Sequence, residues 1–158
     1  MASTALINPN PVVYKPSSTP ALSHPSTTFE IDAILVYDII RSIKDPEHPH
    51  TLEELRVVRE ELITVTKSEK YNIYNVTVNF VPTVPHCSLA TLIGLCIRVK
   101  LKQELPDECK VEINVSEGHH ELEEDVNKQI NDKERVSAAL EQPRLRETVE
   151  ECIKDPEY

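Results

Sequence analysis

Four cysteines are the residues of this chain best suited to redox or metal chemistry: Cys87, Cys96, Cys109 and Cys152. They lie 9, 13 and 43 positions apart, so the sequence contains no Cys-x-x-Cys pair. This spacing excludes a four-cysteine zinc knuckle of the usual kind. A disulfide framework is not expected either, because the N-terminus lacks the basic start and apolar core of a secretory signal. We therefore expect separate thiols with different roles.

Cys87 is the first candidate for a reactive thiol, because it lies between His86 and Ser88 at the expected start of a long apolar helix. The free amides and the dipole of a helix N-terminus favour a thiolate, and a neighbouring protonated histidine favours it further. A thiolate is the form that binds metal or attacks electrophiles. The alternative is a small residue packed under a loop. Cys96 and Cys152, on apolar helical faces, and Cys109, beside a strand, are expected to be structural.

Histidines in three loops offer further metal ligands: His48 and His50 beside Glu47, then His86, and then His119 and His120. Imidazole, carboxylate and thiolate groups together could hold zinc or iron. No pair has the His-x-x-x-His spacing of a helical metal site, and the alternative is that the histidines lie scattered in solvated loops. No Ser–His–Asp order and no nucleotide motif is present, so the residues do not support a self-sufficient enzyme.

The elements that must position these residues follow from periodicity and from proline and glycine positions. A capping box of Thr51 and Glu54 should begin a short turn. The other expected elements are, in chain order, an amphipathic helix over Phe29–Ile43, a stiff loop over Asp45–His50, a hairpin of strands Val57–Thr66 and Tyr71–Val81, a helix over Ser88–Lys102, a strand over Lys110–Val115 and three short helices broken at Asn131-Asp132 and Gln142-Pro143. This order predicts an α+β fold, in which a small three-stranded sheet is covered by helices.

Length, composition and charge limit the domain organisation and the partners. The chain has 158 residues, which suits one domain, and residues 1–28 are rich in Pro, Ser and Thr. We expect residues 1–28 to be a disordered arm and 29–158 to be the folded domain. The net charge of −10 argues against nucleic acid and against an anionic membrane surface. The longest apolar run, Leu89–Ile97, is too short for a membrane span, so a cytosolic or nuclear location is expected.

Three blocks of sequence resemble one known family: Asp45–Leu55 (DPEHPHTLEEL), Pro82–Leu101 (PTVPHCSLATLIGLCIRVKL) and Asn127–Glu141 (NKQINDKERVSAALE). With the spacing between them they cover most of residues 30–153. They resemble the cytosolic iron–sulfur assembly targeting factors of eukaryotes, whose domain also occurs in the bacterial SufT and PaaD proteins. The recurring elements of that group are an Asp-Pro-Glu loop, here Asp45–Glu47, and a Thr-x-x-x-Cys turn, here Thr83–Cys87.

The resemblance implies that Cys87 is the reactive cysteine, with Asp45, Glu47, Thr83 and His86 as its neighbours. It implies a non-enzymatic adaptor that docks cytosolic and nuclear apoproteins for insertion of a four-iron, four-sulfur cluster. The implied partners are a WD-repeat β-propeller subunit, a helical-repeat adaptor and the client apoproteins. No tightly bound cofactor is expected, and a transient cluster or zinc ion on Cys87 is the metal chemistry that the resemblance allows.

Two other functions remain open at this level. The protein could be a carrier that itself ligates iron or a cluster through Cys87, or an enzyme with Cys87 as nucleophile, although no motif places a base beside it. The family has two branches, one tied to DNA-metabolism clients and one to the iron-regulatory aconitase, and this chain has features of both. His119 stands where the family usually has Thr. We also expect a homodimer, because the run Leu89–Leu101 offers more apolar surface than a small sheet covers.

Overall fold

The computed structural model describes residues 12–14, 30–83, 87–116 and 123–155, and these ranges form an α+β domain as expected. None of the helices in these ranges is long and apolar enough to cross a membrane. The elements described are α1 (Ala33–Ile40), the 3-10 helix η1 (Glu60–Leu62), β1 (Ile63–Ser68), β2 (Ile73–Phe80), α2 (Cys87–Glu104), β3 (Cys109–Val115), α3 (Glu123–Asn131), α4 (Lys133–Leu140) and α5 (Pro143–Ile153).

The three strands form one mixed sheet in the order β1-β2-β3. β1 and β2 are the expected antiparallel hairpin, with Ile63 opposite Val78, and β2 pairs with β3 in parallel, with Val78 opposite Ile113. The hairpin loop ends at Asn72, whose φ of 52° lies in the left-handed region that asparagine tolerates. Side chains of β2 alternate as predicted, because Val76, Val78 and Phe80 are fully buried and the residues between them are partly exposed.

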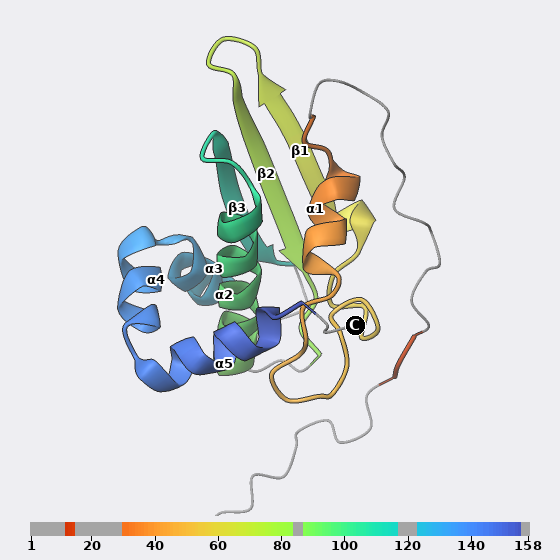
Figure 1. The fold of residues 1–158 in the computed structure, drawn as a ribbon, viewed down its shortest axis with the longest axis vertical. Helices are drawn as coiled ribbons and strands as arrows, with labels where there is room; N and C mark the ends of the chain where they lie inside the picture. The colour runs from red at the N-terminus through yellow and green to blue at the C-terminus, as the bar shows by residue number, and fades with distance from the viewer. Residues whose placement is uncertain (1–11, 15–29, 84–86, 117–122, 156–158) are drawn as a thin grey trace, which may run out of the picture.

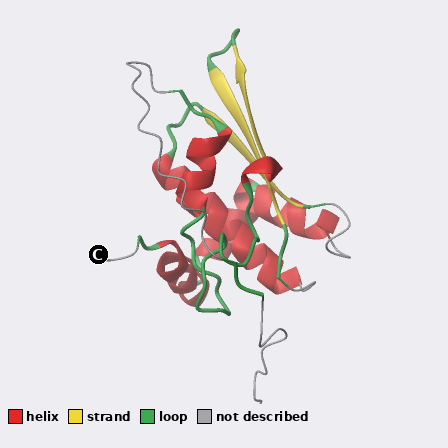
Figure 2. Cartoon of the chain, turned by 90° about the vertical axis from the view of Figure 1, so that its right-hand side faces the viewer, coloured by secondary structure: helices red, strands yellow, loops and turns green. Residues whose placement is uncertain are grey.

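Helices cover the buried face of the sheet, and the tip of the β1–β2 hairpin extends beyond them (Figures 1 and 2). The long helix α2 is central: it packs against β3 and against α1, α3 and α5. Its residues Ile93, Ile97 and Leu101 have no exposed surface. The apolar run that suggested a dimer is therefore largely covered by other elements of the same chain.

The outer edge of β3 is closed by two asparagine side chains of α3. Oδ1 of Asn131 accepts from the Ile113 N–H at 2.9 Å and its Nδ2 donates to the Ile113 carbonyl at 2.7 Å. Asn127 Oδ1 accepts from the Val115 N–H at 2.8 Å. An amide side chain carries the same donor and acceptor as a peptide group, so α3 satisfies this edge as a further strand would.

Two expected elements begin several residues later than the sequence predicted. The first strand begins at Ile63 rather than at Val57, because the chain turns at Arg56, whose φ is 53°, and η1 intervenes. Val57 is fully buried in this turn, so its apolar character comes from core packing and not from a strand. The first helix begins only at Ala33, since Asp32 caps it by accepting from the Leu35 N–H at 2.8 Å.

Most of the expected N-terminal arm, residues 1–28, lies outside the described residues. Residues 12–14 are described, and Tyr14 contacts the domain. Its N–H donates to the Glu54 carbonyl at 2.7 Å, and the Arg56 guanidinium lies 4.2 Å from the centre of its ring. A cation–π contact of this kind contributes on the order of 0.5–1 kcal/mol. Disorder of the arm therefore stays a prediction, with Tyr14 as a point of attachment.

Candidate functional site

The chain leaves β2 toward Cys87 at the carboxyl end of the parallel strands β2 and β3. α2 begins at Cys87, so this residue occupies the N-terminus of an 18-residue helix, as the sequence predicted. Open α/β arrangements commonly bind ligands outside the carboxyl ends of parallel strands. The dipole at a helix N-terminus favours an anionic sulfur at this position.

Two buried hydroxyl groups lie at this carboxyl end of the parallel strands. Thr83 follows β2, Ser116 follows β3, and the Ser116 N–H donates to the Phe80 carbonyl at 2.8 Å. In the described structure the hydroxyl oxygens of Thr83 and Ser116 are buried without a hydrogen-bond partner. Thr83 was predicted as a site residue, whereas Ser116 was missed because no motif marks it. His86 and the side chain of Cys87 lie outside the described structure, so the grouping of Cys87 with its predicted neighbours stays a prediction.

The Asp-Pro-Glu loop is built around the carboxylate of Asp45. The loop is closed by a bridge between Lys44 and Thr51. The Asp45 side chain is 5% exposed, and its Oδ1 accepts from the N–H groups of Glu47 at 2.8 Å and His48 at 3.1 Å. Its Oδ2 has no partner in the described structure. Glu47 is exposed, so its carboxylate points to solvent, unlike that of Asp45.

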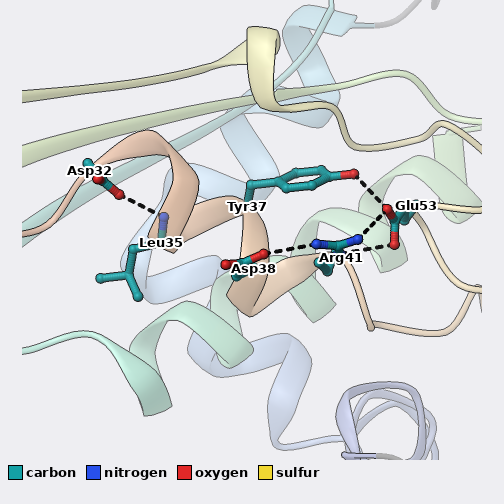
Figure 3. A network of polar contacts seen from close by, with 6 residues as sticks. All are labelled: Asp32, Leu35, Tyr37, Asp38, Arg41 and Glu53. Atoms are coloured by element: carbon teal, nitrogen blue, oxygen red, sulfur yellow. Dashed lines mark hydrogen bonds and ion pairs between the residues drawn. The ribbon is translucent and has the colours of Figure 1, made fainter. Parts of the chain in front are cut away.

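Polar contacts fix both ends of this loop. Thr51 and Glu54 form the predicted capping box, with Thr51 N–H donating to Glu54 Oε2 at 2.8 Å and Glu54 N–H donating to Thr51 Oγ1 at 3.2 Å. Glu53 then joins the turn to α1 (Figure 3), accepting from Arg41 Nη2 at 2.6 Å and from the Tyr37 hydroxyl at 3.2 Å. The hydrogen bond with Glu53 raises the pKa of Arg41 above its usual value.

An open cleft of about 650 Å³ separates the Asp45 loop from α5. Its walls are Lys44, Asp45, Pro46, His48 and Pro49 on the loop side and Glu147, Thr148, Glu150, Glu151, Cys152 and Lys154 on the α5 side. The His48 side chain is 4% exposed, and its Nε2 has no partner in the described structure. The alternative that all histidines lie in solvated loops is therefore wrong for His48. It is buried because the loop folds back over it.

Cys152, in the wall of this cleft, is hydrogen-bonded to Cys96 of α2. Both are buried in the core, as predicted, but their mutual contact was missed because they are far apart in sequence. The hydrogen bond between the two thiols raises the pKa of Cys96, and burial and the charge of Asp45 raise it further. The same hydrogen bond lowers the pKa of Cys152, against the opposing effects of burial and Asp45.

A metal centre is not preformed in the described part of the chain. No group of three or more His, Cys, Asp or Glu residues there is arranged to hold an ion. The donors His86, His119 and His120 lie outside the described residues. Metal binding through Cys87 consequently stays a prediction.

Comparisons with known proteins agree with the resemblance of the three sequence blocks. Residues 35–115 match the family described as iron–sulfur cluster assembly protein. The chain is 49% identical over 159 residues to Protein AE7 of Arabidopsis thaliana, covering 98% of this chain and 99% of that protein. It is 47% identical over 152 residues to cytosolic iron-sulfur assembly component 2B of Mus musculus, covering 94% of this chain and 91% of that protein.

A third relative is the MIP18 family protein galla-1 of Drosophila melanogaster, 57% identical over 122 residues that make up 77% of this chain and 56% of that protein. The family match spans about half of the chain, and these identities extend the likeness to both of its ends. The chain belongs to the iron–sulfur cluster assembly protein family.

Proposed function

We propose that this protein is an adaptor of the cytosolic iron–sulfur assembly machinery, which docks cytosolic and nuclear apoproteins for insertion of four-iron, four-sulfur clusters. Family membership and the name of the mouse relative, cytosolic iron-sulfur assembly component 2B, support a role in cytosolic iron–sulfur assembly. On this proposal the cluster is cargo, the protein is not an enzyme, and it works in the cytosol and in the nucleus. Its partners are a WD-repeat β-propeller subunit, a helical-repeat adaptor and the client apoproteins.

The observation that carries the proposal is the position of Cys87 at the N-terminus of α2, beside the carboxyl end of two parallel strands. This position favours a thiolate, which can hold or accept a soft metal. The buried hydroxyls of Thr83 and Ser116 are hydrogen-bond donors available to an anionic sulfur or a sulfide ligand at this end of the strands. Asp45, Glu47 and His86 complete the proposed site.

Replacement of Cys87 by Ser tests the proposal in cells. We expect the variant to fold and to bind its partners, because replacing sulfur by oxygen at the first residue of a helix changes stability little. Cytosolic client proteins with four-iron, four-sulfur clusters should keep their polypeptide levels but lose iron. Cys109→Ser is the matched control, since Cys109 lies at the start of β3, and it should leave client iron unchanged. Normal client iron in the Cys87 variant would remove Cys87 from this function.

Anaerobic reconstitution with iron and sulfide separates the adaptor from a cluster carrier. The adaptor should stay colourless while it still binds a β-propeller partner in a pull-down. A brown product that disappears in Cys87→Ser would instead show that the chain itself ligates the cluster.

A further inference from the structure

The contact between Cys96 and Cys152 lies apart from the Cys87 turn and has no place in the proposed adaptor function. Cys96 is in α2 and Cys152 in α5, two helices that pack directly against each other. Their side chains are 1% and 6% exposed. Each thiol is the largest influence on the pKa of the other, and in the described structure both thiols are free.

The backbone around this pair is held in place from both sides. The Lys44 N–H donates to the Cys152 carbonyl at 2.9 Å. One turn of α2 beyond Cys96, the buried ammonium of Lys100 donates to the Ile153 carbonyl at 3.3 Å and to Asp155 Oδ1 at 2.8 Å. The two thiols are therefore kept together by contacts that do not depend on the sulfur atoms.

The two thiols differ in acidity and in access. Cys152 lines the cleft beside the Asp45 loop, whereas Cys96 lies behind it. The hydrogen bond from Cys96 and, to a smaller extent, the charge of Lys44 lower the pKa of Cys152, against burial and the charges of Asp45 and Glu151, which raise it. Cys152 is thus the thiol that ionises first and that a small molecule in the cleft can reach, because the thiolate is the nucleophile.

We propose that Cys96 and Cys152 form a reversible disulfide when the protein meets a hydroperoxide, and that this bond fastens α5 to α2. The Cys152 thiolate attacks the peroxide: an S–O bond forms, the O–O bond breaks, and the leaving oxygen takes a proton. The Cys96 sulfur then attacks the resulting sulfenic acid, so that the S–S bond forms and the S–O bond breaks with release of water. Two thiols are oxidised by two electrons, and the peroxide is reduced to an alcohol, or water, plus water.

The bond would act as a switch on the mobility of α5. In a reducing compartment it forms only transiently, as redox-sensing disulfides do. While the disulfide is present, α5 cannot separate from α2, and the width of the cleft between α5 and the Asp45 loop does not change. A disulfide that closes a long loop of chain also stabilises the folded state.

A peptide map of the oxidised protein tests this proposal directly. The full-length protein is reduced, treated with an equimolar amount of hydrogen peroxide, blocked with N-ethylmaleimide and digested without reductant. Chymotrypsin is suitable because it cleaves after the leucines between Cys87 and Cys96, which trypsin leaves in one peptide. We expect loss of two free thiols, a linked peptide pair containing Cys96 and Cys152, and its disappearance with dithiothreitol. The melting temperature should rise by about 5–10 °C on oxidation.

Single substitutions assign the effect. Cys96→Ser and Cys152→Ser should each abolish the linked peptide and the rise in melting temperature, and Cys109→Ser should retain both. The wild-type peptide map decides the matter even if a core variant is unstable. Persistence of both thiols after peroxide, or a linkage through Cys87 or Cys109, would overturn the proposal.

Discussion

The three cysteines whose side chains the structure describes have the same functional group in three different environments. Cys152 accepts a hydrogen bond from Cys96, and this lowers the pKa of its thiol. The pKa of Cys109 is raised by burial and by the charge of Glu108. Cys96, which donates to Cys152 and is fully buried, has a strongly raised pKa. Reactivity at this scale depends on neighbours in space rather than on neighbours in sequence.

These environments predict an order of alkylation with pH. Since only the thiolate reacts, the rate for a thiol with a lowered pKa should rise at lower pH. We expect the half-maximal rate for Cys152 at the lowest pH, that for Cys109 above it, and that for Cys96 highest. Iodoacetamide labelling between pH 6 and 10, read by mass spectrometry for each cysteine, measures the order. A rise for Cys109 at lower pH than for Cys152 would contradict the assigned hydrogen bond.

At the scale of elements, α3 has two separate tasks, since it closes the edge of β3 and packs on α2. Asn131 performs the first task, and its Oδ1 also accepts from Arg98 Nη2 at 2.8 Å. Ile130 packs on α2, because a Cβ atom added at Gly94 of α2 would lie 2.8 Å from the Cδ1 and Cγ2 atoms of Ile130. Gly94 is therefore a point of close packing between α2 and α3.

Replacing Asn131 by Ala should destabilise the domain by about 2–4 kcal/mol, because both backbone groups of Ile113 lose their partner at a partly buried edge. Urea unfolding of the full chain measures the change. Gln129→Ala is the control on the same helix, since Gln129 is exposed, and it should change stability by less than about 0.5 kcal/mol. Equal effects of the two substitutions would show that the edge contact does not stabilise the fold.

Gly94→Ala should also destabilise the protein, by about 1–2 kcal/mol, because steric overlap with Ile130 outweighs the roughly 1 kcal/mol gained in helix propensity. In an Ile130→Ala background the two atoms at 2.8 Å are absent, and the same substitution should become neutral or stabilising. A double-mutant cycle from urea unfolding separates the two contributions. Additive effects would rule out the contact as the reason for glycine at this position.

At the scale of the whole molecule, α2 is the helix against which several other helices and the sheet pack. It contacts α1, α3, α5 and β3, and it lies near the centre of the view in Figure 1. Self-association by exchange of C-terminal helices would therefore require α5 to leave α2. The contacts of Lys100 with Ile153 and Asp155 oppose this step.

Lys100→Ala should consequently raise the fraction of dimer at a given protein concentration, because it releases the end of α5. Sedimentation velocity at tens of micromolar compares the variant with the wild type. Lys102→Ala is the matched control, since Lys102 belongs to the same helix but is exposed. Identical sedimentation of all three proteins would exclude helix exchange as a route to the homodimer.

Local pattern was enough to predict much of this protein. Alternation identified β2 and β3, proline and asparagine positions identified the breaks between the C-terminal helices, and the Thr51–Glu54 capping box follows from four residues. The position of Cys87 at the start of α2 was also predictable, because helix termini are encoded by adjacent residues. The sequence blocks around it were sufficient to indicate the family.

Only the tertiary structure decided which distant residues meet. The parallel pairing of β2 with β3, the asparagines at the edge of β3 and the contact of Cys96 with Cys152 all join segments separated by many residues. Periodicity reports which face of an element is buried but not what covers it. The same limit explains the errors at Val57 and His48, where burial arises from the way a loop folds back on the core and not from a regular local pattern.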